Sequence, residues 1–472
     1  MTNDLMLLMP LIIVGAGAIL LMIASTCDKL TDELAAYGSA GIFAVAFLVQ
    51  LSFCLAGNVA LFSEAFNGIL VASNFSKAAG LIILACGFFT SMSSQAYFKR
   101  NNFCSPEYYS LTAFAAAGML LLTMAQELIT VFIALEIMSL SIYILVGYDR
   151  KSVVSAEAVL KYLMLGAFAG AFFTMGSALV YGGAGSTKFV KIGQYLAANG
   201  MLHSPAIIGG AFFIMVAFLF KAAAFPFHAW VIDVYDGASV PVTGYMATGL
   251  KTAIFAAFAN FLVVDGAMQQ KWITFLFYIS VLTMFVGNLI AIGQQSLKRM
   301  LAASGIVHSG YLLIALVAIG SKDFTGSVIA FYLAAYAAGT LGIFTALSYL
   351  GGTGEARRTF DDFKGLAKSR PYSAAAISIF LLSMAGIPPT AGFMGKFYII
   401  TSAISAGEIT LAVLGIVSSI ISMWYYLRLI IAMYFHEAEE QFDEPAVSSW
   451  APACTFVLVL CVFAISLYPI GV

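Results

Sequence analysis

The sequence predicts an all-α integral membrane protein of about fourteen transmembrane helices, with an inverted five-helix repeat and two discontinuous helices. Of its 472 residues, 62% are hydrophobic and only 10% are charged, and the mean hydropathy is +0.97. A soluble domain carries about 25% charged residues. The apolar residues form long unbroken runs, which favours spanning helices over the short alternating segments of a barrel. The net charge of −1 argues against a nucleic-acid partner.

Fourteen segments provide the roughly 20 apolar residues that a spanning helix needs. The first, 5–25, lacks the basic stretch and the cleavage motif of a signal peptide, so we expect it to stay as a membrane helix. The seventh span has a broken continuation, and the twelfth is interrupted. In chain order, the predicted spans are 5–25, 36–57, 77–97, 108–126, 128–148, 156–182, 205–225, 240–264, 272–293, 301–320, 325–350, 372–404, 409–435 and 451–470.

The distribution of Lys and Arg predicts the orientation, because these residues accumulate in cytoplasmic loops. With the N-terminus outside, the inner loops hold twelve of the 22 Lys and Arg residues, including Lys298 and Arg299. The outer loops hold five, including Lys77, and the other five lie within predicted spans. Both termini are therefore predicted to face the outside, which is the periplasm in a bacterium. The strongly basic loop 351–371 is then cytoplasmic.

The cysteines predict no special chemistry. The six are scattered, mostly within apolar runs, and form neither a CxxC motif nor a cluster with histidine. We therefore expect no metal centre, no iron–sulfur cluster and no disulfide framework in this chain.

Ionisable residues inside the predicted spans are the candidate functional residues. A charge at mid-membrane costs about 2.5–3.5 kcal/mol on insertion scales, so such side chains usually face a hydrated interior and pair. Burial disfavours a charged amine and a nearby carboxylate favours it, so a lysine whose carboxylate partner comes and goes can load and release a proton. The candidates are Glu136, Lys221, Lys251, His308 and Lys396.

Three ionisable residues are open to a second interpretation. His308 could be a core histidine whose hydrogen bonds are satisfied. Lys161 and Arg428 lie near the inner ends of their spans, where a long side chain can snorkel to the membrane surface. For these two residues, snorkelling and function are equally open.

Two spans carry helix-breaking residues at membrane depth. One break lies in KAAAFPFHAW, residues 221–230, and the other in AGIPPTAGFMGK, residues 385–396. Proline and glycine free backbone groups there, and these groups need partners from protein or water. Discontinuous helices of this kind mark ion paths in secondary transporters.

The polar residues recur at similar spacings in the two halves of the chain. Glu136 and Lys221 are 85 residues apart, and His308 and Lys396 are 88 apart. Lys221 is 30 residues before Lys251, and Lys396 is 32 before Arg428. Spans 5, 7 and 8 thus correspond to spans 10, 12 and 13, and this offset of five spans reverses the orientation. We predict an inverted repeat of spans 4–8 and 9–13. The resulting domains are 1–107 (three helices), 108–264 and 265–435 (the two repeats) and 436–472 (the last helix).

Three stretches carry a resemblance to a known family. They are ALEIMSLSIYILVGY with Glu136, FLFKAAAFPFHAWVIDVYDGASVPVTGYMATGLKTAIF with Lys221 and Lys251, and QQSLKRMLAASGIVHSGYLL with His308. Together they resemble the antiporter-like membrane subunits of respiratory complex I. The same superfamily includes the Mrp-type Na⁺/H⁺ antiporter subunits. The resemblance covers nearly the whole chain.

Within this family, the sequence resembles the N type. The L type carries a long lateral helix after its core spans, whereas this sequence runs to Val472, just past the fourteenth span. The M type usually has glutamate where Lys396 stands. The Mrp D type also has lysine there, so an Mrp-type Na⁺/H⁺ antiporter subunit is the alternative. Animal mitochondrial N-type subunits lack the first three helices, so their presence here favours a bacterial protein.

The resemblance implies a proton-translocating, non-redox subunit of a NADH:quinone oxidoreductase. It implies that Glu136 pairs with Lys221, that Lys251 and His308 form the central link, and that Lys396 serves the exit half-channel. It implies no cofactor in this chain, since NADH, FMN, iron–sulfur clusters and quinone are expected in partner subunits. The expected neighbours are the L-, M- and K-type subunits and the bilayer of a bacterial inner membrane. A purely structural spacer is disfavoured by four separate mid-membrane charges.

Overall fold

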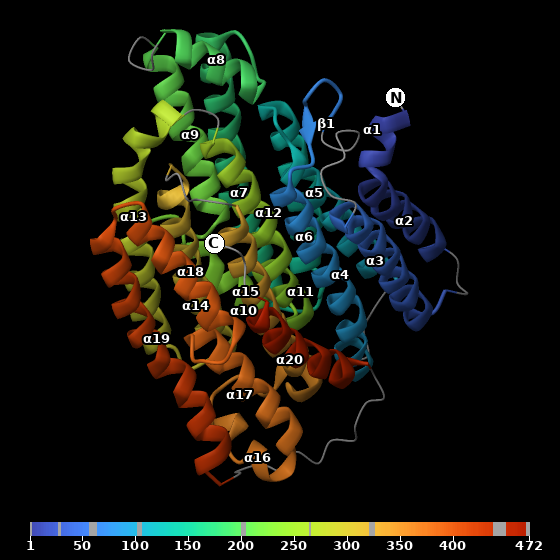
Figure 1. Ribbon diagram of the computed structural model, residues 1–472. Coiled ribbons are helices and arrows are strands. Elements are labelled where there is room, and N and C mark those ends of the chain that lie inside the picture. The colour runs from blue at the N-terminus through green and yellow to red at the C-terminus, as the bar shows by residue number, and fades with distance from the viewer. Residues whose placement is uncertain are drawn as a thin grey trace.

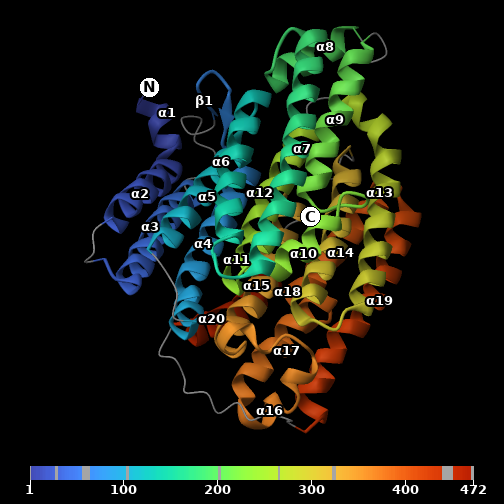
Figure 2. The same cartoon turned by 180° about the vertical axis from the view of Figure 1, so that it is seen from behind.

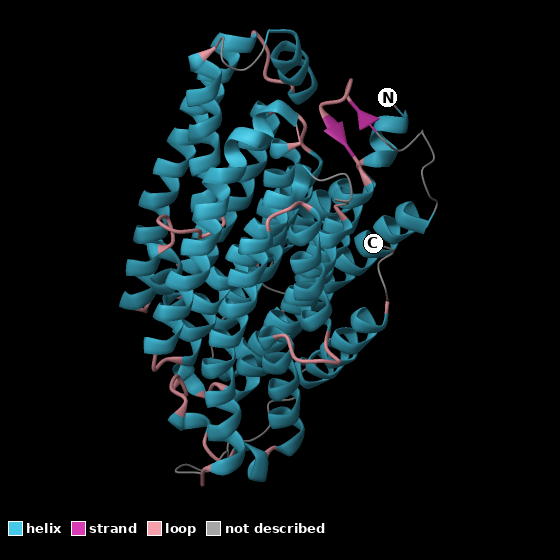
Figure 3. Cartoon of the chain, turned by 60° about the vertical axis from the view of Figure 1, so that its left-hand side comes forward, coloured by secondary structure: helices cyan, strands magenta, loops and turns pink. Residues whose placement is uncertain are grey.

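The computed structural model describes residues 2–26, 30–55, 64–101, 106–199, 204–263, 266–320, 326–437 and 450–468. Within these ranges, helices form nearly all of the regular structure (Figure 3). The exception is an antiparallel hairpin of two short strands, β1 (Glu64–Ala65) and β2 (Leu70–Val71). Helices suit a bilayer because their backbone polar groups are paired within the same segment.

The N-terminal helices lie along one edge of the bundle, opposite α13 and α19, in both views (Figures 1 and 2). They are α1 (Thr2–Leu7), α2 (Met9–Ser25), α3 (Asp32–Leu55) and α4 (Asn74–Asn101). The next group is α5 (Glu107–Met124), α6 (Leu128–Val146), α7 (Val153–Ala184), α8 (Phe189–Asn199), α9 (Pro205–Lys221), α10 (Ala229–Gly237), α11 (Val240–Tyr245), the π-helical turn η3 (Met246–Leu250) and α12 (Lys251–Leu262).

The remaining helices complete the bundle. The long ones are α13 (Gly266–Gly293), α14 (Leu297–Val317), α15 (Ser327–Leu350), α17 (Pro371–Ala385), α18 (Ala391–Ser405), α19 (Ile409–Phe435) and α20 (Ala451–Leu467). Short helical turns are η4 (Ala318–Gly320), η5 (Thr353–Glu355), η6 (Asp361–Phe363) and α16 (Leu366–Ser369).

Over its described residues, each of the fourteen predicted spans corresponds to one helix or to consecutive helices. By length and composition, eight of the described helices are suited to cross a membrane, and α2, α9, α17 and α20 are shorter apolar helices. The prediction of an all-helical, multi-pass membrane protein is therefore confirmed.

The bundle has an apolar exterior and a central pair of buried helices. Large apolar side chains such as Leu48 of α3, Met164 of α7 and Ile420 of α19 point outward and are exposed. Contiguous apolar surface of this kind requires an apolar environment, which lipid supplies. By contrast, α14 and α15 are almost wholly buried within the bundle. His308 belongs to α14, so the candidate site lies in the protein core.

Both predicted helix breaks are present. The first separates α9, which ends at Lys221, from α10, which begins at Ala229. The second separates α17, which ends at Ala385, from α18, which begins at Ala391. Gly386 closes α17 with a φ of 85°, the left-handed conformation common just after a helix.

Candidate functional site

The four basic candidates are all buried in the core. Lys221, Lys251, His308 and Lys396 have exposed fractions of 7%, 4%, 4% and 5%. Glu136 of α6 is partly buried. They come from five different helices, and the helix breaks and the π-turn occur beside three of them. What each side chain contacts decides whether they form one site.

Lys221 lies at the end of α9, where the first break begins. Its Nζ donates a hydrogen bond of 2.7 Å to Ser139 Oγ of α6. Glu136 is three residues from Ser139 on the same helix, but no nitrogen–oxygen distance within 4.0 Å joins it to Lys221. Glu136, the expected partner of Lys221, thus lies about one helical turn along α6 from Ser139, the residue that Lys221 contacts.

Aromatic rings complete the surroundings of Lys221. The ring centroids of Tyr143 and Tyr162 each lie 5.5 Å from its Nζ. An ammonium over an aromatic face gains electrostatic stabilisation, and more so where water is excluded. The rings therefore help to hold a cation whose carboxylate is not in direct contact.

Lys251 is the first residue of α12 and directly follows the π-turn η3. Its Nζ donates to the carbonyl of Gly305 on α14 at 2.5 Å and lies 5.1 Å from the ring of Tyr336. Single π-turns inside helices are often found at functional sites. The π-turn thus directly precedes the lysine whose Nζ contacts the backbone of α14.

A serine hydroxyl links the first break to Lys251. Ser309 Oγ donates to the carbonyl of Ala222, the residue after Lys221, at 2.6 Å. It also contacts the Gly305 carbonyl at 3.2 Å, which is the oxygen that accepts from Lys251. Polar atoms therefore continue from the end of α9 to Lys251.

His308 lies between hydroxyl groups on both sides of its ring. Nδ1 is 2.6 Å from Tyr332 Oη, and Nε2 is 3.2 Å from Tyr426 Oη. The ring of Tyr336, which also faces Lys251, lies 4.7 Å from the imidazole ring. The histidine is thus hydrogen-bonded in the core, and Tyr336 joins it to Lys251.

Lys396 lies in the second turn of α18, and its side chain reaches the second break. Its Nζ donates to the carbonyl of Ala385 and to Ser419 Oγ, each at 2.9 Å. Ala385 ends α17, so its carbonyl has no partner within that helix, and a cation is favoured there by the helix dipole. The ring of Tyr311 lies 5.0 Å from the same Nζ.

A small cavity joins Lys396 to His308. Its volume is about 10 Å³, and its walls include His308, Tyr332, Tyr336, Ser383 and Lys396. This volume is at the lower limit of what one water molecule needs. The described residues therefore bring Lys221, Lys251, His308 and Lys396 into one buried series of polar groups.

Sequence reasoning missed the uncharged members of this series. Ser139 and Ser309 make direct contacts, and tyrosines surround each cation. A possible signal was present for Ser309, which directly follows His308 in the chain. The tyrosines carried no such signal, because an aromatic residue in a spanning helix usually only fills space.

Several loop assignments made from the sequence were wrong. Lys298 and Arg299 belong to the first turn of α14, and Lys77 belongs to α4, where it is buried. Ser296 caps α14 by accepting from the Arg299 amide, so the helix starts earlier than its apolar run. Of the other loop lysines, Lys29 and Lys322 and the side chain of Lys271 lie outside the described residues.

Charged residues in the N-terminal parts of α7 and α14 and on α10 form a network. Lys161 pairs with Glu157 and with Asp233, each at 2.7 Å. Arg299 pairs with Asp233 at 3.2 Å and with Asp236 at 3.3 Å. Lys161 therefore has carboxylate partners within the protein.

Arg428 also has partners within the protein. Its Nη1 donates to the carbonyl of Gln294 at 3.2 Å, and its guanidinium lies 4.3 Å from the ring of Phe360.

Comparison with known proteins indicates the same family as the sequence motifs. Residues 125–422 match a family described as NADH:quinone oxidoreductase/Mrp antiporter, TM. A protein from Trichlorobacter lovleyi named NADH-quinone oxidoreductase subunit N is 41% identical over 381 residues, 80% of this chain and 78% of its own. A protein of the same name from Chloroflexus aggregans is 38% identical over 442 residues, 92% of this chain and 89% of its own.

Solved structures agree. A chain in respiratory complex I from Thermus thermophilus has a TM-score of 0.81 and 31% identity, with 97% of both chains covered. A chain in the Mrp complex from Dietzia sp. DQ12-45-1b has a TM-score of 0.81 and 20% identity, covering 99% of this chain and 95% of its own. The second likeness concerns the fold alone. The resemblance identified from the sequence motifs is confirmed.

Proposed function

Because this chain belongs to the NADH:quinone oxidoreductase/Mrp antiporter family, we propose that it is the proton-translocating N subunit of a complex I-type NADH-quinone oxidoreductase. One observation carries the proposal: a buried series of polar groups runs from Lys221 through Lys251 and His308 to Lys396. Buried ionisable groups inside a membrane protein are expensive and mark ion paths.

The proposed topology has fourteen crossings, with both termini on the periplasmic side of a bacterial inner membrane. Its two inverted repeats are 108–264 and 265–435, flanked by 1–107 and 436–472. The coincidence of each predicted span with a helix supports this topology, as do the breaks before α10 and before α18.

In the proposed mechanism, a proton enters from the inner side toward Lys221. Glu136 lies one turn from the present partner of that lysine, so a change of side-chain conformation can bring the two together. An engaged carboxylate keeps the ammonium protonated, and its withdrawal favours release. The proton then passes beside Ser309 to Lys251.

From Lys251 the proposed path continues to His308, Lys396 and the outer side. Tyr336 contacts both Lys251 and His308. The small cavity between His308 and Lys396 has room for one bridging water. Further water molecules complete the transfer at both ends of the series.

This subunit carries protons, and the redox chemistry belongs to partner subunits. NADH, FMN, iron–sulfur clusters and quinone are assigned there, and no cofactor is assigned to this chain. The proposed membrane neighbours are the L-, M- and K-type subunits. Relatives and structural neighbours from multi-subunit complexes support a role beside other membrane subunits.

The decisive experiment measures NADH-driven proton pumping by the assembled complex in proteoliposomes, alongside quinone reduction. We expect Lys221→Ala and Glu136→Ala to abolish redox-coupled pumping through this subunit. Lys191→Ala is the matched control, because Lys191 is exposed on α8. If both buried variants pump like the unaltered complex, the proposal is wrong.

An Mrp-type Na⁺/H⁺ antiporter subunit is the second candidate, because the matched family covers both groups. The two are separated by mass spectrometry of the proteins that copurify with the tagged chain. Iron–sulfur subunits and two larger antiporter-like proteins indicate complex I. A set of small membrane proteins without a redox subunit indicates the antiporter.

A further inference from the structure

A polar cavity opens at the inner end of the bundle, away from the series of buried lysines. Its volume is about 330 Å³. Its walls come from the end of α4, the loop between α6 and α7, the junction of α10 and α11, and the loop 353–358. In the proposed topology these loops face the cytoplasm. The cavity can therefore supply water and protons from that side.

A buried carboxylate lies in the wall of this cavity. Glu355 Oε2 pairs with Lys298 Nζ at 2.7 Å, and Oε1 accepts from Tyr97 Oη and from the Val240 amide, each at 3.0 Å. Glu355 is only 9% exposed, and its φ of 56° is rare for any residue but glycine. Strained residues of this kind persist where surrounding contacts hold them, often at functional sites.

From Tyr97, a polar face of α4 runs into the membrane. Cys86, Thr90, Ser93 and Tyr97 are spaced so that they share one side of the helix. This side meets α15, where Ser348 Oγ donates to the Ser93 carbonyl at 3.2 Å. The eleven residue steps from Cys86 to Tyr97 span about 16 Å at 1.5 Å per residue.

Two hydroxyl groups at this contact between α4 and α15 have no hydrogen-bond partner within the described residues. The hydroxyls of Thr90 on α4 and Thr345 on α15 are buried without a hydrogen bond, and both residues are 1% exposed. Buried polar groups are nearly always bonded, to ordered water where the protein offers nothing. The unpaired atoms therefore mark positions for water.

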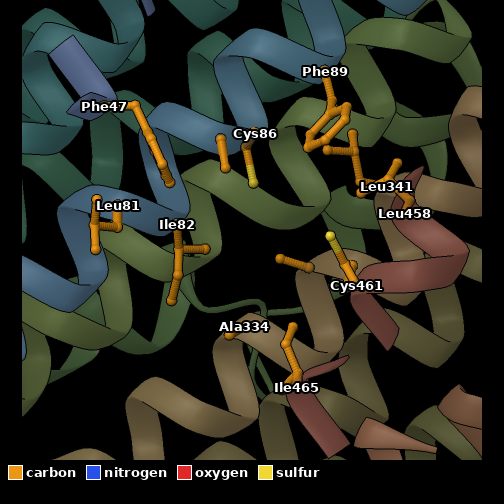
Figure 4. Close-up of a pocket in the computed structure, with 13 residues that line it drawn as sticks. Phe47, Leu81, Ile82, Cys86, Phe89, Ala334, Leu341, Leu458, Cys461 and Ile465 are labelled. Atoms are coloured by element: carbon orange, nitrogen blue, oxygen red, sulfur yellow. The ribbon is translucent and has the colours of Figure 1, made fainter. Parts of the chain in front are cut away.

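The face leads toward Lys251. Cys86, at the end of the face away from the cavity, lies beside Thr248 of the π-turn η3, three residues before Lys251. Beyond Cys86, toward α20, lies a cavity of about 190 Å³ lined by apolar side chains such as Phe89 and Leu458 (Figure 4). An apolar cavity stays dry. Water on this face is thus directed to the π-turn and kept from the lipid side.

Building on the proposed function, we propose that Glu355 and this face of α4 form a proton-uptake path from the inner cavity to Lys251. A proton from the cavity adds to the Glu355 carboxylate and weakens its pair with Lys298, which keeps its bond to the Ala238 carbonyl. The Tyr97 hydroxyl takes that proton from Glu355 and gives its own to water beside Ser93. The path makes the N-terminal three-helix segment part of the proton machinery.

The other charged groups facing Glu355 belong to the same cavity. Arg358 donates through Nε to the Glu355 backbone carbonyl at 2.9 Å. Asp149 and Asp236 line the cavity wall, together with Lys151. Both signs of charge are therefore present around the cavity.

The test measures redox-coupled proton pumping by the assembled complex in proteoliposomes. We expect Glu355→Gln, and separately the double variant Thr90→Val with Ser93→Ala, to lower pumping to the level of Lys251→Ala. The double variant leaves the Glu355–Lys298 pair intact, so it remains informative if Glu355→Gln assembles poorly. Glu355→Asp keeps a carboxylate and should restore part of the pumping and shift its pH profile.

Ser91→Ala is the matched control. Ser91 neighbours Ser93 on α4 but faces α3, where its Oγ lies 2.9 Å from Ser39 Oγ. Its pumping should equal that of the unaltered complex. If Lys251→Ala stops pumping while the Glu355 and α4 variants pump normally, the uptake path is wrong and the proposed function stands. If Lys251→Ala itself pumps normally, both are wrong.

Discussion

Replacement of Lys298 by methionine tests the ion pair at the inner cavity most directly. The side chains are similar in length, but Lys298→Met removes the ammonium that contacts Glu355 at 2.7 Å and the Ala238 carbonyl at 2.6 Å. The carboxylate then keeps only two neutral donors, each at 3.0 Å. Removing one partner of a buried pair costs about 3–5 kcal/mol, so we expect about 3 kcal/mol of lost unfolding free energy.

The reverse change should cost less. Glu355→Gln keeps an oxygen for the Tyr97 hydroxyl and the Val240 amide, and loses the charge-assisted bond to Lys298, which is worth about 1.5–3 kcal/mol. The double variant Lys298→Met with Glu355→Gln leaves no charge at either position of this pair. It should therefore be more stable than Lys298→Met alone.

Chemical denaturation of the purified chain in detergent micelles measures these differences. Lys368→Met is the control, because Lys368 meets Glu437 at 3.7 Å with both side chains largely exposed. An exposed pair of this kind contributes less than about 1 kcal/mol. If Lys298→Met costs no more than the control, or if the double variant loses the sum of both single changes, the reasoning about the buried charge is refuted.

Three further predictions follow from local geometry. Gly392→Ala should lower the unfolding free energy by about 1–3 kcal/mol, because its Cβ would lie 1.8 Å from a carbonyl oxygen of α17. Gly182→Ala is the control in the same denaturation assay. Its Cβ would meet nothing within 4 Å, so this change should be neutral or slightly stabilising. Tyr332→Phe removes the 2.6 Å contact with His308 and should slow pumping in proteoliposomes without loss of assembled complex; unchanged pumping would contradict the role of that hydroxyl. Burial raises the pKa of Asp362, but hydrogen bonds from two backbone amides of its own turn outweigh this and hold its pKa below the usual value. Its contribution to stability should thus be complete at neutral pH and disappear as the pH falls through its folded pKa, below about 4, in a pH series that compares Asp362→Asn with the unaltered chain.

The sequence predicted the helices and the buried cations because both leave strong local signals. Long apolar runs mark spans, and proline with glycine at 385–396 marks a break. Which group meets Lys221 could not be predicted, since Ser139 and Glu136 lie one turn apart on the same helix and both side chains can accept from an ammonium. Helical periodicity places both near the lysine without choosing between them.

The pair at the inner cavity was missed for a different reason. Lys298 and Arg299 adjoin the start of an apolar run, and two neighbouring cations at a span end are typical of a solvated loop. Ser296 offered a helix-capping signal that starts α14 earlier. Glu355, however, meets Lys298 across 57 residues and through a loop, and no local pattern reports such a contact.

The π-turn η3 affects the direction in which the Lys251 side chain points. A π-turn contains about one residue more than an α-turn, and each residue of an α-helix advances the side-chain direction by about 100°. Deleting a single residue between Met246 and Leu250 would let the backbone bonding run on as a regular α-helix. It would also rotate α12 by that angle relative to α11, whose Tyr245 donates to the Thr112 carbonyl at 3.3 Å. A deletion or insertion of even one residue within this span should therefore turn the Lys251 side chain away from its partner, the Gly305 carbonyl of α14.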